Sequence, residues 1–189
     1  DPRALAQPSE SNWDTFAEVA QAVTDLGGEN KVFAMNSWWA NYGYFVNSAG
    51  GGFFTDDRTA CALDTPESIA GITQMKAVYD GGLALAWGED GEPAWKAGTV
   101  GMFMNGRWAT PGSREIKDFN WDVAPLPTGA AEGKNWQFWG AYVINAKTAN
   151  PDAAVKLVQE LTSADVQAKI SSLGANIPSR TSQEAIDKF

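Results

Sequence analysis

The residues of this sequence that are best suited to binding a ligand are tryptophans next to amide and guanidinium side chains. They form three groups, whose candidate binding residues are Asn36, Trp38, Trp39, Asn41 and Tyr42 in the first, Asn105, Arg107 and Trp108 in the second, and Trp139 and Gly140 in the third. An indole offers a flat apolar face, and amides and guanidinium groups form planar, directed hydrogen bonds. A pyranose ring has a C–H face and a rim of hydroxyls, so the groups predict binding of a saccharide without covalent chemistry.

Each group also has a simpler explanation. Neighbouring residues on a helix point about 100° apart, so one of Trp38 and Trp39 is expected in the core. Arg107 is suited to a salt bridge, at the surface or between parts of the fold, as well as to a hydrogen bond with a ligand hydroxyl. Trp136 is expected to be an exposed loop indole that needs no ligand. Three other tryptophans, at periodic or strand positions, are expected in the core: Trp13, Trp95 and Trp121.

The amino-acid composition excludes several classes of catalytic site and metal site. The sequence has no histidine, which removes Ser-His-Asp and Cys-His nucleophiles and HExxH zinc sites. Its one cysteine, Cys61, makes neither an intrachain disulfide nor a cysteine-rich metal site, and we expect it to be a small buried hydrophobe. We therefore predict no catalytic residues, no metal and no cofactor.

Charge and loop composition narrow the ligand class further. The 189 residues carry a formal net charge of −9, a field that repels phosphate backbones, so nucleic acid is not expected as a partner. The glycine run 50–52 lacks a phosphate-loop signature and predicts a mobile turn. The pairs Asp56-Asp57 and Glu89-Asp90 lack EF-hand spacing and are expected to be solvated acidic loops. No apolar run approaches the ~18 residues of a membrane span.

Helices and strands alternate along the chain to position the three groups. Apolar spacing, caps and Gly or Pro breaks predict helices over 13–26, 38–48, 66–80, 93–97, 108–117, 151–161 and 164–173, and strands over 31–35, 99–104, 121–124 and 140–145. Ser11 or Asn12 is expected to cap the first helix and Thr65 the third, and Pro111-Gly112 to interrupt the fifth. This alternation favours an α/β fold. The first two tryptophan groups follow predicted strands, where ligands bind in open α/β folds.

Several stretches resemble one known family when they are taken in order. They are WDTF at 13–16, LDTPE at 63–67, AGTVGMFMNGRW at 97–108, WDVAPLP at 121–127 and NIPSR at 176–180. Each is a weak motif alone, but their common order and spacing resemble the extracellular solute-binding proteins of ABC importers, of the maltose-binding-protein type that carries sugars and oligosaccharides.

This resemblance implies a fold and a division of the chain. Its members have a two-lobed, type II periplasmic-binding-protein-like fold and are substantially longer than 189 residues. The resemblance therefore implies a fragment: a lead-in or hinge at 1–12, a nearly complete α/β lobe at 13–126, and a hinge crossover with a partial segment of the second lobe at 127–189. The fragment alone is expected to bind ligand weakly or not at all.

The resemblance also implies a function. We expect the substrate-binding component of an ABC transporter, which binds a sugar or oligosaccharide, closes by hinge bending and delivers it to permease subunits. It implies an extracellular or periplasmic protein that is anchored as a lipoprotein in its full-length form. Two alternatives stay open: a glycoside hydrolase, which needs two carboxyl groups facing across the aromatic cleft, and a protein-binding module, which needs a flat aromatic patch.

Overall fold

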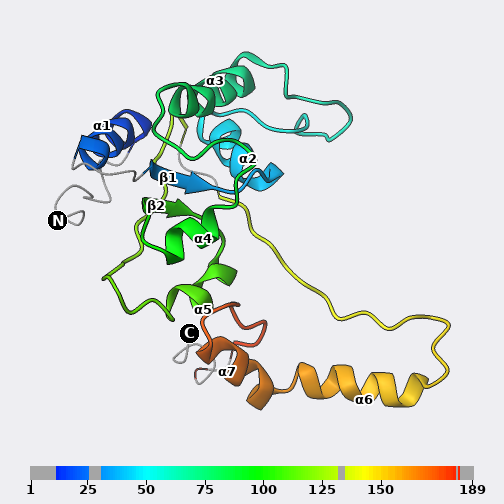
Figure 1. Cartoon of the computed structure of the whole chain (residues 1–189). Helices are drawn as coiled ribbons and strands as arrows, with labels where there is room; N and C mark the ends of the chain where they lie inside the picture. Colours follow the sequence, from blue (N-terminus) through cyan, green and yellow to red (C-terminus); the bar gives the residue numbers. More distant parts are fainter. Residues whose placement is uncertain (1–11, 26–30, 132–134, 182, 184–189) are drawn as a thin grey trace. The chain divides into compact units, whose positions relative to one another are not determined.

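The computed structural model describes residues 12–25, 31–131, 135–181 and 183 (Figure 1). These residues belong to two compact units. The first consists of described residues within 1–105 and 116–136, and the second of those within 106–115 and 137–189. The chain thus passes from one unit to the other after Asn105, after Glu115 and after Trp136.

A small parallel sheet lies at the centre of the first unit. Strand β1 (Lys31–Met35) pairs in parallel with β2 (Val100–Met104), with Met35 opposite Met104 (Figure 1). The segment 83–85 runs along the other side of β1, where the Phe33 amide donates to the Leu83 carbonyl at 3.2 Å. The carboxyl ends of these three segments therefore lie at one edge of the sheet.

Among its described residues, the first unit also contains the helices α1 (Trp13–Asp25), α2 (Trp39–Ser48), α3 (Pro66–Asp80) and α4 (Gly91–Lys96). The predicted caps at Asn12 and Thr65 are confirmed. Oδ1 of Asn12 accepts from the Thr15 amide at 2.9 Å, and Oγ1 of Thr65 accepts from the Ser68 amide at 3.3 Å. Each cap satisfies an amide that has no carbonyl partner inside its helix.

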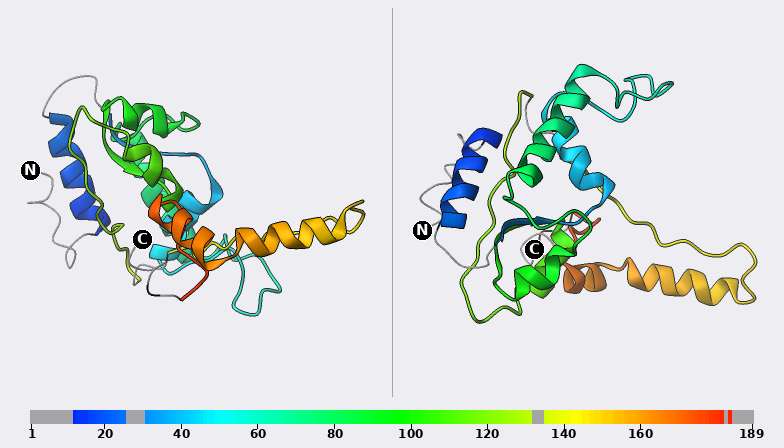
Figure 2. Two further views of the ribbon diagram at one scale, coloured as in Figure 1. Left: turned by 90° about the horizontal axis from the view of Figure 1, so that it is seen from below. Right: turned by 45° about the horizontal axis from the view of Figure 1, so that its top comes forward.

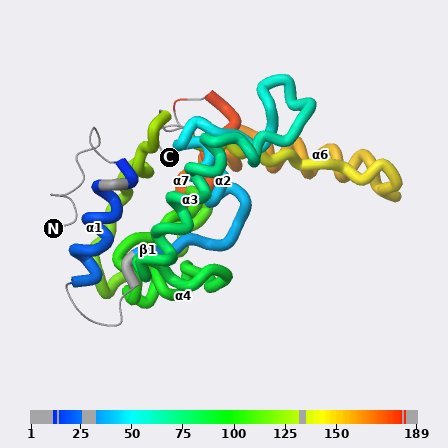
Figure 3. Tube along the Cα trace, turned by 90° about the horizontal axis from the view of Figure 1, so that it is seen from above, coloured from blue at the N-terminus to red at the C-terminus, as the bar shows by residue number. Residues whose placement is uncertain are grey.

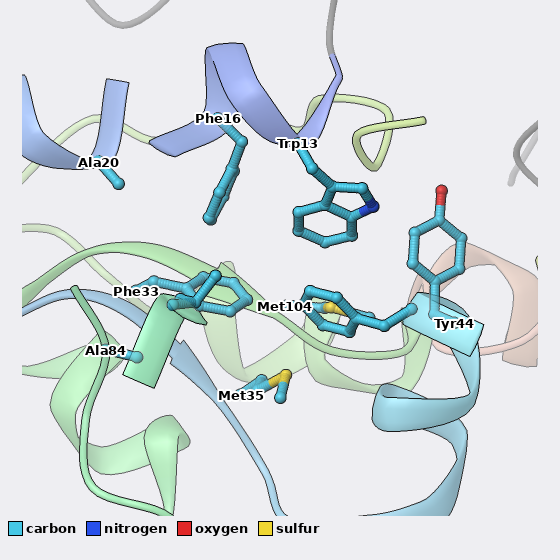
Figure 4. Packing of buried hydrophobic residues seen from close by; sticks show 10 residues of the cluster. Trp13, Phe16, Ala20, Phe33, Met35, Tyr44, Ala84 and Met104 are labelled. Atoms are coloured by element: carbon cyan, nitrogen blue, oxygen red, sulfur yellow. The ribbon is translucent and has the colours of Figure 1, made fainter. Parts of the chain in front are cut away.

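Aromatic side chains from α1, α2 and β1 form the core (Figure 4). Trp13 is buried and stacks on Phe45 with ring centroids 4.0 Å apart, and its Nε1 donates to Oγ of Ser48 at 3.0 Å. The prediction that Trp13 is a core residue is confirmed. Trp95 and Trp121 are half-buried and pack edge-on at 6.5 Å in a smaller cluster, together with Phe103 and Phe119.

Helices α2 and α3 lie side by side (Figure 2 and Figure 3), and glycines allow them to pack closely. A Cβ at Gly71 would lie 2.5 Å from the Phe45 carbonyl oxygen, and one at Gly51 would lie 2.4 Å from Oγ of Ser68. The turn predicted at 50–52 is present, and Ser68 holds it to the start of α3 because its Oγ accepts from the Gly52 amide at 3.2 Å.

The second unit contains the short helix η2 (Arg107–Ala109), α5 (Thr110–Ser113), α6 (Pro151–Leu161) and α7 (Ala164–Ser172). The helices predicted at 151–161 and 164–173 are confirmed, the latter followed by Gly174 with φ +81°. Pro111 lies in the first turn of α5 and does not interrupt it, because a proline there lacks only an amide that would be unpaired anyway. The buried positions among this unit's described residues are Ser113, Ala168, Ser171 and Gly174.

Three predictions about the fold are wrong. Residues 121–124 and 140–145 are not strands in the described structure, since a strand needs the backbone of a partner and the sequence pattern does not supply one. Cys61 is exposed, because it lies in a loop where Phe54 and Cys61 form an antiparallel bridge. Ile69 shares the helical spacing of Ile72, Met75 and Tyr79, which predicts that these four residues line one face of the helix, but Ile69 is exposed. Ser68 and Gly71 are buried in that part of the helix instead.

Candidate ligand-binding site

The carboxyl edge of the sheet brings polar and aromatic residues from three segments together. Asn36, Ser37 and Trp38 follow β1, Trp87 follows the segment 83–85, and Asn105 follows β2. Two hydrogen bonds fix this edge: Oδ1 of Asn36 accepts from the Gly91 amide at 3.0 Å, and Oγ of Ser37 accepts from the Gly88 amide at 2.6 Å. The loop before α4 is thereby fastened beside Trp38.

Two predicted binding residues help to build this edge. Asn41 is buried, and its Nδ2 donates to the Asn36 carbonyl at 2.7 Å. The Asn36 side chain is half-buried and holds the start of α4. Both side-chain amides therefore fix the backbone that precedes α2. A ligand would have to bind to other polar atoms of these two side chains than the ones in these hydrogen bonds. Their role as ligand residues stays a prediction.

Five aromatic rings form what we call the aromatic platform: Trp38, Trp39, Tyr42, Phe53 and Trp136. Trp38 and Trp39 meet edge to face with centroids 5.4 Å apart, and Trp39 meets Trp136 at 5.0 Å. Phe53 lies 5.8 Å from Tyr42 and 5.6 Å from Trp136. Trp39 is 40% exposed, so the platform presents an apolar ring at the surface.

Phe53 and Trp136 are the members of the platform that the sequence did not reveal. Trp136 was predicted to be an exposed loop indole, and this is wrong: the residue is half-buried, and its Nε1 donates to the Ala40 carbonyl on α2 at 2.9 Å. Phe53 follows the glycine run and was assigned no role. A sequence signal was available in Gly43, where a Cβ would lie 2.7 Å from both rings.

Other predicted residues belong to the second unit. Trp108 is 46% exposed and meets Phe138 edge to face at 5.8 Å, next to the exposed Trp139. A Cβ on Gly140 would meet nothing within 4 Å. The structure thus brings Asn36, Trp38, Trp39, Asn41 and Tyr42 together in one unit, and Trp108 beside the segment that leads to Trp139 in the other.

Gly106 and Arg107 lie directly after β2. Gly106 was expected to permit a sharp turn, but its φ of −79° is open to any residue; a glycine is needed because a Cβ would lie 2.2 Å from the Trp108 ring. Desolvation, and secondarily the positive charge of Arg114, lowers the pKa of Arg107. An arginine stays protonated in proteins despite such a shift, so its guanidinium remains able to donate hydrogen bonds.

The described residues also bear on metal binding, on the order of an acidic loop and on membrane-spanning helices. In the part of the chain that the structure describes, no three or more Cys, Asp or Glu side chains are placed to hold a metal ion. Asp57 is exposed, and hydrogen bonds from Thr55 and Thr59 lower its pKa. Its carboxylate therefore stabilises the turn of this acidic loop. None of the described helices is long and apolar enough to span a lipid bilayer.

Comparisons with known proteins agree on one protein family. The family model described as bacterial extracellular solute-binding protein matches residues 3–168. A binding protein of Brucella abortus is 24% identical over an alignment of 193 residues that covers 95% of this chain and 46% of that protein. The chain therefore spans about half the length of the curated relatives it matches.

Solved structures show the fold. The GacH receptor of Streptomyces glaucescens has a TM-score of 0.81 at 22% identity, over 97% of this chain and 50% of its own. The substrate-binding protein Lmo0181 from Listeria monocytogenes has a TM-score of 0.78 at 18% identity, over 94% and 47%. UgpB from Mycobacterium tuberculosis has a TM-score of 0.78 at 17% identity, over 98% and 49%. The prediction of an α/β fold that makes up part of such a protein is confirmed.

Proposed function

Because this chain belongs to the bacterial extracellular solute-binding protein family, we propose that it forms part of the substrate-binding component of an ABC importer for a sugar or oligosaccharide. The observation that carries this proposal is the aromatic platform at the carboxyl edge of a parallel sheet. No covalent change of the ligand is required, and the protein acts as a receptor rather than an enzyme. Its further partners are the permease subunits.

The chemistry of the platform supports a saccharide. An exposed indole removes the C–H face of a sugar ring from water, which is favourable in proportion to the apolar area buried. Relatives named above were solved with cycloalternan, in the case of Lmo0181, and with acarbose, in the case of GacH, which supports the same class of ligand. UgpB was solved with glycerophosphocholine, which makes that compound the comparison ligand to test.

We propose that the ligand contacts come from three groups of residues. The first comprises Trp38, Trp39 and Tyr42, with remaining atoms of Asn36 and Asn41, the second comprises Asn105, Arg107 and Trp108, and the third comprises Trp139 and Gly140. Since the chain spans about half the length of its relatives, we propose that residues outside it complete the site. The lobe at 13–126 and the crossover at 127–189 remain our proposed division.

The proposed mechanism is closure on the ligand. A saccharide shifts the equilibrium toward a closed form only if it binds that form more tightly than the open one. Residues that meet the saccharide only in the closed form would supply this difference in affinity. The closed form would then be what the permease recognises, outside the cytoplasm; a lipoprotein anchor in the full-length protein is part of the same proposal.

The proposal is tested with the full-length protein. A thermal-shift screen uses a panel of maltose, maltotetraose, acarbose, cycloalternan and glycerophosphocholine, and we expect a saccharide to raise the melting temperature because it binds the folded state. Calorimetry then compares the wild type with the Trp38→Ala/Trp108→Ala variant, which should bind no measurable saccharide while keeping its fold. Trp121→Ala, outside all three groups, is the matched control. Unchanged affinity in the double variant, or a response to glycerophosphocholine alone, would overturn the proposal.

A further inference from the structure

Trp136 occupies a singular place in the chain. It is the last residue of the first unit before the chain enters the second at Gln137, and it reaches α2, which lies far away in the sequence. Its indole lies against that of Trp39: the centroid distances from Trp39 are 5.0 Å to Trp136, 5.4 Å to Trp38 and 6.1 Å to Phe53.

A hydrogen bond and ring packing hold the Trp136 ring in one orientation. Its Nε1 donates to the Ala40 carbonyl at 2.9 Å, and its ring is tilted by 36° against Phe53 at 5.6 Å. The absent side chain of Gly43 makes the space, because a Cβ there would approach Cζ2 of Trp136 to 2.7 Å. A ring fixed by a hydrogen bond and by packing on two sides restricts the rotamers of the neighbour that it touches.

We propose that Trp136 is a positioning residue: it fixes the indole of Trp39 in the orientation that a saccharide requires, and so couples saccharide binding to the attachment of the crossover segment 135–137. This inference rests on the proposed function of the platform. Trp136 itself need not touch the saccharide, since it acts through the edge-to-face contact with Trp39.

The coupling must be reciprocal. If attachment of Trp136 strengthens saccharide binding by a given factor, bound saccharide strengthens the attachment of residues 135–137 by the same factor. Opening of this segment exposes its backbone amides to solvent exchange. A saccharide on Trp39 should therefore slow amide exchange at 135–137 in the wild type.

The experiment compares Trp136→Phe and Trp136→Ala with the matched control Trp121→Phe, which alters an edge-to-face tryptophan contact outside the platform. The probe is the panel saccharide that gives the largest rise in melting temperature with the full-length wild type. An edge-to-face pair and one hydrogen bond predict Kd about tenfold weaker in Trp136→Ala and about threefold weaker in Trp136→Phe. Trp121→Phe should leave Kd unchanged. Slowed exchange at 135–137 should occur in the wild type and disappear in Trp136→Ala.

The two proposals fail in different ways. If the wild type binds no panel saccharide, the proposed function fails and this inference with it. If the wild type binds and Trp136→Ala binds within twofold of it, the inference alone fails. If Trp136→Ala does not fold, Trp136→Phe decides: unchanged Kd together with unchanged exchange at 135–137 would overturn the positioning role.

Discussion

Gly106 sets the position of the Trp108 ring. A Cβ at this position would lie 2.2 to 2.3 Å from three atoms of the indole, while the backbone conformation suits any residue. We expect Gly106→Ala to fold but to displace the ring, lowering saccharide affinity of the full-length protein about three- to tenfold, the value of one aromatic contact. Calorimetry measures this. Gly52→Ala, where the nearest atom is 3.4 Å away, is the control, and equal affinity in both variants would contradict the prediction.

Tyr79 makes the stability of the fold sensitive to alkaline pH. Burial raises the pKa of Tyr79 to about 12, whereas an unfolded tyrosine loses its proton near pH 10, about its ordinary value. Between these values the unfolded chain ionises first, so the stability present below pH 10 is lost as the pH rises toward 12. Burial also raises the pKa of Tyr44, so Tyr79→Phe should remove only the part of the loss that is due to Tyr79. That part is about 1 kcal/mol at pH 11, after allowance for partial solvent screening.

Chemical denaturation between pH 8 and 11 checks the Tyr79 prediction. The wild type, measured over the same pH range, is the reference. An equally steep loss of stability in Tyr79→Phe would show that burial of this phenol does not govern the alkaline response.

The residues of the site differ in how far the sequence could reveal them. Trp38 and Trp39 stand out because an aromatic pair after a strand, flanked by asparagines, is a local pattern. Trp136 and Phe53 reach the same platform from distant segments, and no local pattern records that contact. Neither of the paired tryptophans is fully buried, because both rings lie at the carboxyl edge of the sheet.

At the scale of elements, the crossing of α2 and α3 depends on Gly71. A Cβ there would meet the Phe45 carbonyl oxygen at 2.5 Å and the Val46 Cα at 2.7 Å, and both are backbone atoms that cannot turn aside. Gly71→Ala should therefore force the helices apart and lower the free energy of unfolding by about 1–3 kcal/mol. A urea denaturation curve measures the change, with Gly52→Ala as the control. A midpoint equal to that of the wild type would mean that the helices are not in such close contact.

The elements also show why some predictions succeed. Some elements could be predicted because their signals are local: caps, prolines and a regular spacing of apolar side chains within or next to the element. These elements are helices α1, α3, α6 and α7 and strands β1 and β2. Residues 121–124 and 140–145 have the composition of strands, but strand formation is decided by a partner elsewhere in the fold. The same limit explains Ile69, because a local apolar spacing does not show which turn of the helix meets the core: α3 reaches it through Val78, with Met75 and Tyr79 beside it.

At the scale of the whole molecule, the two units differ in how they are stabilised. The first has an aromatic core, whereas the described residues of the second bury no large hydrophobic side chain. The second unit instead exposes a set of apolar residues: Trp108, Phe138, Trp139, Tyr142, Val143, Ile144, Val155, Leu157, Leu173 and Ile177. A surface of this kind favours association, because covering it removes apolar area from water.

This exposed surface predicts self-association of the 189-residue chain when it is produced alone. We expect sedimentation velocity to show the sedimentation coefficient rising with concentration, and Leu157→Lys/Ile177→Lys to reduce the rise, because both side chains are more than half exposed and a lysine opposes their burial. Ile69→Lys, a change of an exposed isoleucine on the first unit, is the matched control. In the full-length protein, residues outside this chain would cover the surface, so Leu157→Lys should there lower the melting temperature instead. A wild-type chain that stays monomeric at every concentration would contradict this account.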